Sequence, residues 1–143
     1  MVLKPEAIRE RLLRLEDVIS RLEDLGRLEA SQLRADFRDA WAVERGLQLA
    51  SEIVFDIGNH ILSAHYGKSA QDYEDIIAQL GAMGVTSAST GEGLKGLGGF
   101  RNILVHGYLQ LDLDRVVAHL RDAPTRFSAF NHDVRAWMAR TIG

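Results

Sequence analysis

Apolar residues recur every three or four positions over most of the chain, which is the spacing of one face of an α-helix. Over residues 5–25 this seam consists of Ile8, Leu12, Leu15, Ile19 and Leu22. Pro5 suits the first turn of such a helix, and Gly26 suits the position just after its end. The pattern therefore predicts a first helix over residues 5–25, with its charged opposite face in solvent.

The longest periodic stretch predicts a single helix over residues 31–66. Ser31 is a candidate N-cap, and Tyr66-Gly67 is a candidate end. Its main apolar stripe is formed by Val43, Leu47, Ala50, Val54, Ile57 and Ile61. Because Leu49, Ile53 and Phe55 add apolar surface on other sides, we expect this helix to lie at the centre of the fold.

Two weaker segments follow. Residues 71–82 predict a short helix, and residues 85–99 are rich in glycine, each of which costs a helix interior up to about 1 kcal/mol relative to alanine. Residues 91–96 also match the G-x-G-x-x-G string of dinucleotide-binding proteins. We discount that match because no hydrophobic strand precedes it. A further helix is expected to end at about His106, close to Gly107.

The last helix is expected to begin at Asp112 or Asp114, and Pro124 predicts a break or kink near Ala123. Its inward-facing side chains are expected to be Val116, Val117, Leu120, Phe127, Phe130, Val134 and Trp137. With only two prolines and few alternating β-branched residues, the prediction for residues 1–143 is a single all-α domain. The expected architecture is an up-and-down helical bundle of about five helices.

The amino-acid composition mainly excludes certain kinds of protein and site. The 143 residues suit one domain, and the absence of cysteine excludes disulfides and thiolate metal sites. A net charge of −3 means that a polyanion would have to bind a local patch rather than the whole surface. No long apolar run and no signal-peptide pattern is present, so we expect no membrane association and a cytoplasmic location.

One block, residues 99–108, gathers the most reactive side chains in the chain: Arg101, Asn102, His106 and Tyr108. On a helix, Arg101 and His106 are separated by roughly 140° around the axis and about 7.5 Å along it. Two such side chains can reach a common point beside the helix but cannot easily bond each other. This spacing suits a site that holds a phosphate between a guanidinium and an imidazole.

The same block, Arg-x4-His-x-Tyr with asparagine directly after the arginine, resembles the signature of the HEPN superfamily and of its HepT-like branch of toxin–antitoxin ribonucleases. Two further strings, Trp41–Ala50 and Asp56–Ile61, resemble that branch in the same order, and the likeness covers about residues 5–122. The resemblance implies an HEPN-like helical fold. It also implies a homodimer in which two motif helices face each other.

If the block is catalytic, metal-independent endonucleolytic cleavage of RNA is the reaction that fits, with no cofactor and no metal ligands. Histidine changes charge near neutral pH, so His106 can take the proton of a ribose 2′-OH or protonate the leaving 5′-oxygen. Arg101 offers a planar fork of donors to the developing charge on phosphorus. Asn102 would orient the imidazole ring or bind a phosphate oxygen.

The resemblance implies a regulatory partner as well. In HepT-like proteins of type VII-like toxin–antitoxin pairs, the tyrosine of this block accepts AMP groups from a cognate nucleotidyltransferase antitoxin, which points here to Tyr108. Without the family, a buried tyrosine with a hydrogen-bonded hydroxyl is an equal interpretation. A second hypothesis for the whole chain is a non-catalytic adaptor that binds a nucleotide or a partner, and the glycine-rich segment before Arg101 favours it.

Residues 31–66 also carry a polar stripe that ends in Asp56 and Asn59. We expect both to lie deep among apolar residues and to need partners, because an unpaired buried polar group costs about 1–3 kcal/mol. Arg101 or His106 would be suitable partners. Hydrogen bonds between helices are an equally good explanation, and the residues alone do not decide between them.

The first part of that stripe is basic, with Arg34, Arg38 and Arg45. A solvated face, contact with the RNA backbone and docking of an antitoxin are the three interpretations left open. Four apolar residues are candidates for a patch at a dimer interface, although each suits the core equally: Leu22, Leu25, Trp41 and Leu109. The histidines outside the block are interpreted as structural or solvated, with His119 and His132 on charged surfaces.

Overall fold

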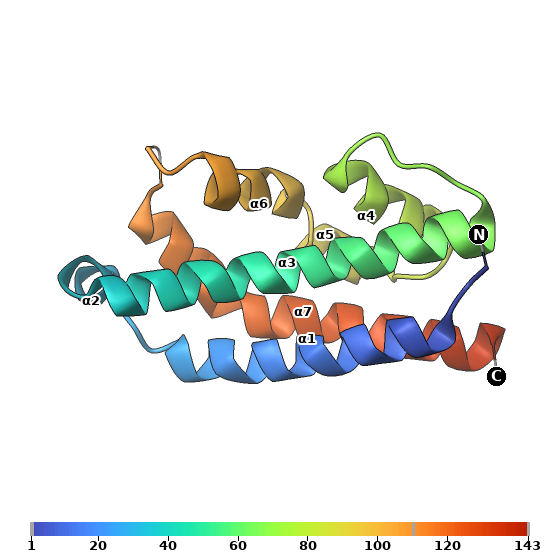
Figure 1. Cartoon of the computed structure of the whole chain (residues 1–143), viewed down its shortest axis with the longest axis horizontal. Coiled ribbons are helices and arrows are strands. Elements are labelled where there is room, and N and C mark those ends of the chain that lie inside the picture. Colours follow the sequence, from blue (N-terminus) through green and yellow to red (C-terminus); the bar gives the residue numbers. More distant parts are fainter. Residues whose placement is uncertain (1, 110, 143) are drawn as a thin grey trace.

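The computed structural model describes residues 2–109 and 111–142, and there the chain forms seven helices and no strand (Figure 1). In chain order they are α1 (Pro5–Leu25), α2 (Ala30–Ala35), α3 (Phe37–Tyr66), α4 (Tyr73–Ala82), α5 (Ala88–Gly93), α6 (Leu97–His106) and α7 (Leu113–Thr141). The predicted all-α class is confirmed. The two six-residue helices, α2 and α5, come in addition to the expected long and short ones.

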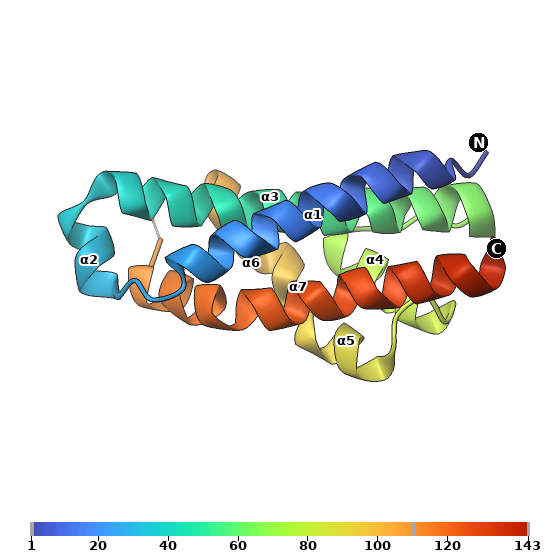
Figure 2. The ribbon, with the colours of Figure 1, turned by 90° about the horizontal axis from the view of Figure 1, so that it is seen from below.

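The three long helices, α1, α3 and α7, lie side by side, and α1 crosses over the line between α3 and α7 (Figure 2). The core lies between them, where the predicted seams meet. Leu12, Leu47 and Phe130, one from each helix, are at most 2% exposed. Helices α4 and α6 pack on another side of α3 (Figure 1). The predicted central position of α3 is therefore confirmed.

The single helix predicted over residues 31–66 is wrong at its start, because the chain breaks at Asp36. That residue is extended (φ −134°, ψ 108°), and its carboxylate accepts a hydrogen bond from the backbone N–H of Arg38. A side chain that caps the following helix in this way competes with continuing the preceding one. Ser31 is not the N-cap either, since Glu29 and Gln32 form a capping box at the start of α2.

The break predicted at Pro124 does not occur, and α7 runs from Leu113 to Thr141 without interruption. Proline removes one backbone hydrogen bond from a helix. Here, side chains on both sides of it are anchored in the core, with Leu120 and Ala123 before it and Phe127 after it at most 4% exposed. Packing on both sides therefore holds together a helix that local propensity alone would interrupt. The predicted cap at Asp112 is confirmed.

Two glycines of the glycine-rich segment set the position of α6. Gly96 has φ +87°, a backbone conformation that side chains disfavour, and it turns the chain into α6. A Cβ atom at Gly98 would lie 2.8 Å from the Cβ of Tyr73, so only glycine lets α6 approach α4 this closely. The segment therefore contains the short helix α5, a turn at Gly96 and a close helix contact at Gly98.

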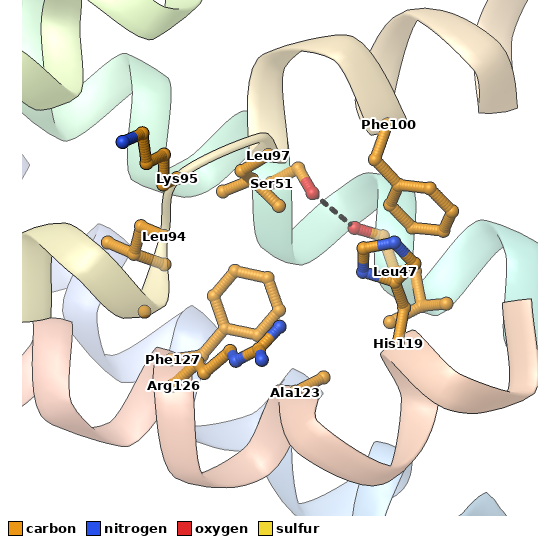
Figure 3. Close-up of a pocket in the computed structure, with 11 residues that line it drawn as sticks. Leu47, Ser51, Leu94, Lys95, Leu97, Phe100, His119, Ala123, Arg126 and Phe127 are labelled. Carbon is orange, nitrogen blue, oxygen red and sulfur yellow. Dashed lines mark hydrogen bonds between the residues drawn. The ribbon is translucent and has the colours of Figure 1, made fainter. Parts of the chain in front are cut away.

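The buried side of α6 is held against α7. Phe100 is 5% exposed, and its ring stacks on that of His119 with 3.7 Å between centroids. A cavity of about 20 Å³ beside this pair has room for about one water molecule (Figure 3). Around this pair the interior beneath α6 is therefore closely packed. None of the described helices is long and apolar enough to cross a membrane.

Candidate functional site

The side chain of Arg101 on α6 is half-buried, and three other residues contact its guanidinium. Its guanidinium forms an ion pair with Glu52 of α3 at 3.1 Å and donates to Asn102 Oδ1 at 3.3 Å. The guanidinium carbon also lies 4.8 Å from the centre of the Tyr73 ring on α4, which is the geometry of a cation–π contact. Three elements of the fold therefore determine where this cation points.

The guanidinium is not fully satisfied by these contacts. Its Nε atom is buried and has no acceptor among the described residues. A buried donor without a partner is rare in folded proteins and calls for a reason, which is often function. The ion pair is also incompletely buried, with Arg101 17% and Glu52 35% exposed, so the guanidinium borders the surface and can meet a ligand there.

Sequence reasoning placed Glu52 and Tyr73 on their helices but gave neither a role at the site. Glu52 also accepts a hydrogen bond from Gln48 Nε2 at 3.2 Å, which fixes its carboxylate from the side away from α6. The position of Glu52 in the sequence could have indicated its role, because Glu52 lies on the polar stripe one turn before Asp56. No periodicity could show that Tyr73, an ordinary apolar position of a short helix, would lie beneath the guanidinium.

His106 and Tyr108 lie at the opposite, exposed end of α6. His106 is the last helical residue, and Gly107 closes the helix by donating its N–H to Ile103 O at 2.9 Å. The His106 side chain has no hydrogen bond or ion pair within the described part of the chain. Tyr108 is 79% exposed, which rules out the interpretation of a buried tyrosine. Both groups are therefore presented to solvent or to a partner.

The expected burial of Asp56 and Asn59 is wrong, because both are exposed. Arg101 pairs instead with Glu52, which lies one turn before Asp56 on α3. Asp56 and Asn59 border a groove of about 470 Å³ between α1 and α3, together with His60. Their supporting role therefore stays a prediction, and the structure gives it no contact to the motif.

The three arginines of the basic stretch have separate positions. Arg34 belongs to α2 and pairs with Asp114 at 3.2 Å. The guanidinium of Arg38 lies 5.3 Å from the centre of the Phe37 ring. Arg45 is exposed beside a groove between α1 and α3. The single stripe predicted for them is therefore interrupted at Asp36, and only Arg38 and Arg45 share α3.

The prediction that His119 lies on a charged surface is wrong, because its ring packs on Phe100 (Figure 3). Burial lowers the pKa of His119, and the nearby Arg126 and Arg115 lower it further. Burial, followed by the charges of Arg11 and Lys4, also lowers the pKa of His60. Over the described residues, no three histidine or carboxylate side chains are grouped closely enough to hold a metal ion.

Two known nucleases are similar to this chain in sequence. The mRNA nuclease HepT of Shewanella oneidensis is 34% identical over 98 residues, which cover 66% of this chain and 74% of that protein. The tRNA nuclease HepT of Aphanizomenon flos-aquae is 25% identical over 137 residues, covering 95% of this chain and 92% of that protein.

Among solved structures, the tri-AMPylated Shewanella oneidensis HEPN toxin in complex with its MNT antitoxin superposes with a TM-score of 0.81 at 27% identity. The match covers 93% of this chain and 99% of that one. YutE of Bacillus subtilis, a cytosolic protein of unknown function, superposes with a TM-score of 0.84 at 22% identity, which shows the fold alone. That match covers 100% of this chain and 96% of the YutE chain.

A family model described as Ribonuclease HepT-like matches residues 15–133, which is most of the chain. The match includes α3, with Glu52, and the whole of α6, with Arg101 and His106. The family and the class of activity predicted from the sequence are thereby confirmed: the chain belongs to the HepT-like ribonuclease family.

Proposed function

We propose that this protein is a metal-independent RNA endonuclease in which Arg101 binds the phosphate and His106 transfers the proton. The observation that carries the proposal is the presentation of the two groups on α6. Arg101 is held by Glu52 and Tyr73 at the border of the surface, and His106 stands exposed five positions further on. A fixed cation and an accessible acid–base group are what in-line attack by a ribose 2′-OH requires.

In this reaction the 2′-oxygen attacks the adjacent phosphorus, and the bond from phosphorus to the 5′-oxygen breaks. The 2′-OH proton leaves to a base, and the 5′-oxygen takes a proton from an acid. The products are a 2′,3′-cyclic phosphate and a free 5′-OH. Arg101 stabilises the charge that develops on the phosphorus oxygens, and Asn102, which accepts from Arg101, keeps its amide beside the same point.

A homodimer would supply the second proton-transfer group, because one imidazole cannot readily be both base and acid in a single turnover. Support comes from the apolar surface beside His106, where Leu109 is 87% exposed and Ile103 and Val105 are only half-buried. Among the other residues predicted for an apolar patch, Leu22 is fully buried and belongs to the core. The dimer predicts a molar mass of twice the chain in light scattering.

We further propose that a nucleotidyltransferase antitoxin restrains the nuclease by transferring AMP to Tyr108. The exposure of Tyr108 supports this, and so does the related toxin, which is described as tri-AMPylated in complex with an MNT antitoxin. An AMP group two residues from His106 would place negative charge where RNA has to bind. Mass spectrometry after coexpression with the cognate nucleotidyltransferase tests this point, and an unmodified Tyr108 would contradict it.

The nuclease is tested with purified protein and RNA in the presence of EDTA. We expect cleavage by the unaltered protein, products with a 2′,3′-cyclic phosphate, and loss of cleavage in Arg101→Ala and in His106→Ala. Equal cleavage by all three proteins would refute the assignment. A DNA strand of the same sequence is the control, because it lacks the 2′-OH and should remain intact.

The adaptor hypothesis loses the feature that favoured it. Its support was a soft glycine-rich segment ahead of Arg101, whereas Gly96 serves a turn and Gly98 serves a close contact with α4. The guanidinium is consequently held firmly, as catalysis needs. The cytoplasmic location and the single-domain extent over residues 1–143 stay predictions.

A further inference from the structure

The first turns of α3 expose two large aromatic side chains. Phe37 is 56% exposed and Trp41 is 66% exposed, so neither ring is needed to fill the core. The rings meet edge to face, with 4.9 Å between centroids and an angle of 70° between planes. The two rings pack on each other, while most of their apolar surface stays in water. Such an exposed aromatic pair is typical of a surface that receives another molecule.

Trp41 points to the same side of α3 as the candidate site. It lies eleven residues before Glu52, and eleven residues rotate a helix by about three full turns plus 20°. Glu52 carries the ion pair with Arg101, so the ring and the site share one face of α3. Phe37 lies one turn before Trp41, and its ring contact with Trp41 extends the aromatic surface toward the start of α3.

The direction of α6 brings the reacting end toward these rings. α6 runs antiparallel to α3, so His106 is displaced from Arg101 toward the start of α3 (Figure 1). Along the axes, Trp41 lies about 16 Å from Glu52, and His106 lies about 7.5 Å from Arg101. The remaining distance of roughly 9 Å equals about three nucleotides at the stacked spacing of 3.4 Å.

The charge around the rings suits a phosphate backbone. Arg38 and Arg45 are exposed, and neither has a carboxylate within 4 Å among residues 2–109 and 111–142. Of the nearby carboxylates, Asp39 lies on another side of the helix, about 200° from Trp41. Glu44 is half-buried, and burial raises its pKa. Two more carboxylates lie close by, because Asp36 caps α3 directly before Phe37 and Asp24 lines the same groove as Arg45. The face beside the rings therefore offers two guanidiniums that no carboxylate pairs with, and these can bind phosphates.

We propose that these four residues, Phe37, Arg38, Trp41 and Arg45, form a subsite for unpaired RNA next to the bond that is cut. Flanking bases stack on the aromatic rings, and the backbone phosphates lie against the two guanidiniums. Because every base has a π-face, such a subsite selects single-stranded RNA without selecting a sequence. The inference rests on the proposed nuclease function and names the form of its substrate.

Binding of a labelled single-stranded oligoribonucleotide tests the subsite without interference from cleavage, if His106→Ala is the common background. We expect Trp41→Ala to weaken binding by about 5- to 150-fold, the range for loss of one stacking ring, and Trp41→Phe to recover most of it. Trp41→Leu keeps apolar area without a π-face and should not recover binding. Leu13→Ala, which removes a 61% exposed side chain on α1, is the matched control and should change nothing.

Intrinsic fluorescence gives a second measurement, because the chain has two tryptophans and only Trp41 is exposed. Trp137 is 2% exposed and donates its N–H to Tyr66 at 3.0 Å, so RNA cannot reach it. Stacking of a base should quench the emission of the unaltered ring, and the quenching should disappear in Trp41→Ala. Binding without quenching would overturn the stacking proposal.

The remaining outcomes separate this inference from the nuclease proposal. If the unaltered protein cuts RNA but Trp41→Ala binds and cuts single strands as well as before, the subsite is wrong and the nuclease stands. If Trp41→Ala instead halves the molar mass in light scattering, the rings form a protein interface, and the subsite is again wrong. If the unaltered protein neither binds nor cuts RNA, the nuclease proposal itself fails.

Discussion

The two ends of α6 differ in how their functional side chains are held. At the first end, Arg101 contacts Glu52 on α3 and Tyr73 on α4, and Gly98 lets the helices approach closely enough for these contacts. At the other end, His106 stands in solvent without a partner among the described residues. Contacts within the fold position the Arg101 guanidinium, whereas the His106 imidazole is free to contact a substrate or a second protein chain.

This difference separates two tasks of the proposed nuclease, phosphate binding and proton transfer. A phosphate-binding cation gains most from being fixed in advance, because its charge then needs no rearrangement as negative charge develops on phosphorus. A proton-transfer group has to reach different oxygens of the substrate and, in the proposed dimer, to cooperate with a second copy. The exposed end is also where the proposed AMP acceptor, Tyr108, is accessible to another enzyme.

The largest expected effect is on the cleavage rate, and it should be similar for Arg101 and His106. Replacing either Arg101 or His106 with alanine should lower the cleavage rate by about 10²- to 10⁴-fold. The effect on stability should separate them. Arg101→Ala removes an ion pair and a ring contact and should lower the free energy of unfolding by about 1 kcal/mol. His106→Ala should change it by less than about 0.5 kcal/mol.

Urea denaturation of both variants, together with rate measurements on one RNA, checks this separation. If His106→Ala loses as much stability as Arg101→Ala, the imidazole is held by the fold after all, and the contrast between the two ends is wrong.

The next largest effect concerns the close contact between Gly98 of α6 and α4, which positions the end of α6 that carries Arg101. At Gly98 an added Cβ would lie 2.8 Å from Tyr73 Cβ and 3.2 Å from the backbone nitrogen of Glu74, so something has to move. Gly98→Ala should therefore cost about 1–3 kcal/mol of stability and slow cleavage, because α6 is pushed away from α4. Calorimetric melting and initial rates measure the two consequences.

The neighbouring residue provides the control. A Cβ at Gly99 meets nothing within 4 Å, and Gly99 lies in the same helical turn. Gly99→Ala should raise stability by up to about 1 kcal/mol through helix propensity and leave the rate unchanged. Equal losses in both variants would show that the glycines matter for chain flexibility rather than for the contact.

A smaller effect is expected from the partner of the cation. Glu52→Gln keeps an oxygen that can accept from Arg101 but removes the charge that orients the guanidinium. We expect about a tenfold lower kcat with little change in KM, since the loss is one of positioning. Glu52→Asp should be intermediate. A rise in KM with kcat unchanged would instead show that Glu52 acts on substrate binding alone.

The smallest expected effect is a pH dependence of stability that comes from His119, which packs against the buried face of α6. The pKa of His119 is lowered in the folded state by burial against Phe100 and by nearby arginines. As pH falls below about 6.5, the unfolded chain takes up the proton more readily than the folded one, so stability decreases. His119→Gln should therefore flatten the loss of stability between about pH 7 and pH 5, by less than about 1.4 kcal/mol per pH unit. An unchanged slope in urea denaturation would contradict this assignment.

Much of the fold follows from local chemistry that can be read along the chain. The helical seams, the cap at Asp112 and the end at Gly67 were predicted and are confirmed, because period and capping depend on neighbours within a few residues. The break at Asp36 and the continuous helix through Pro124 were missed. At both positions the outcome depends on which of two competing interactions prevails, a capping side chain in the first and core packing in the second.

What the sequence determined by itself is the set of reactive groups and their order along α6 and the turn after it, from Arg101 to Tyr108. Only the tertiary structure decided what each of them meets. Arg101 pairs with Glu52, 49 positions away in the chain, and the expected partners Asp56 and Asn59 face solvent instead. The reason is physical: periodicity tells which side of a helix faces the core, whereas the packing of helix against helix selects which residues meet across it.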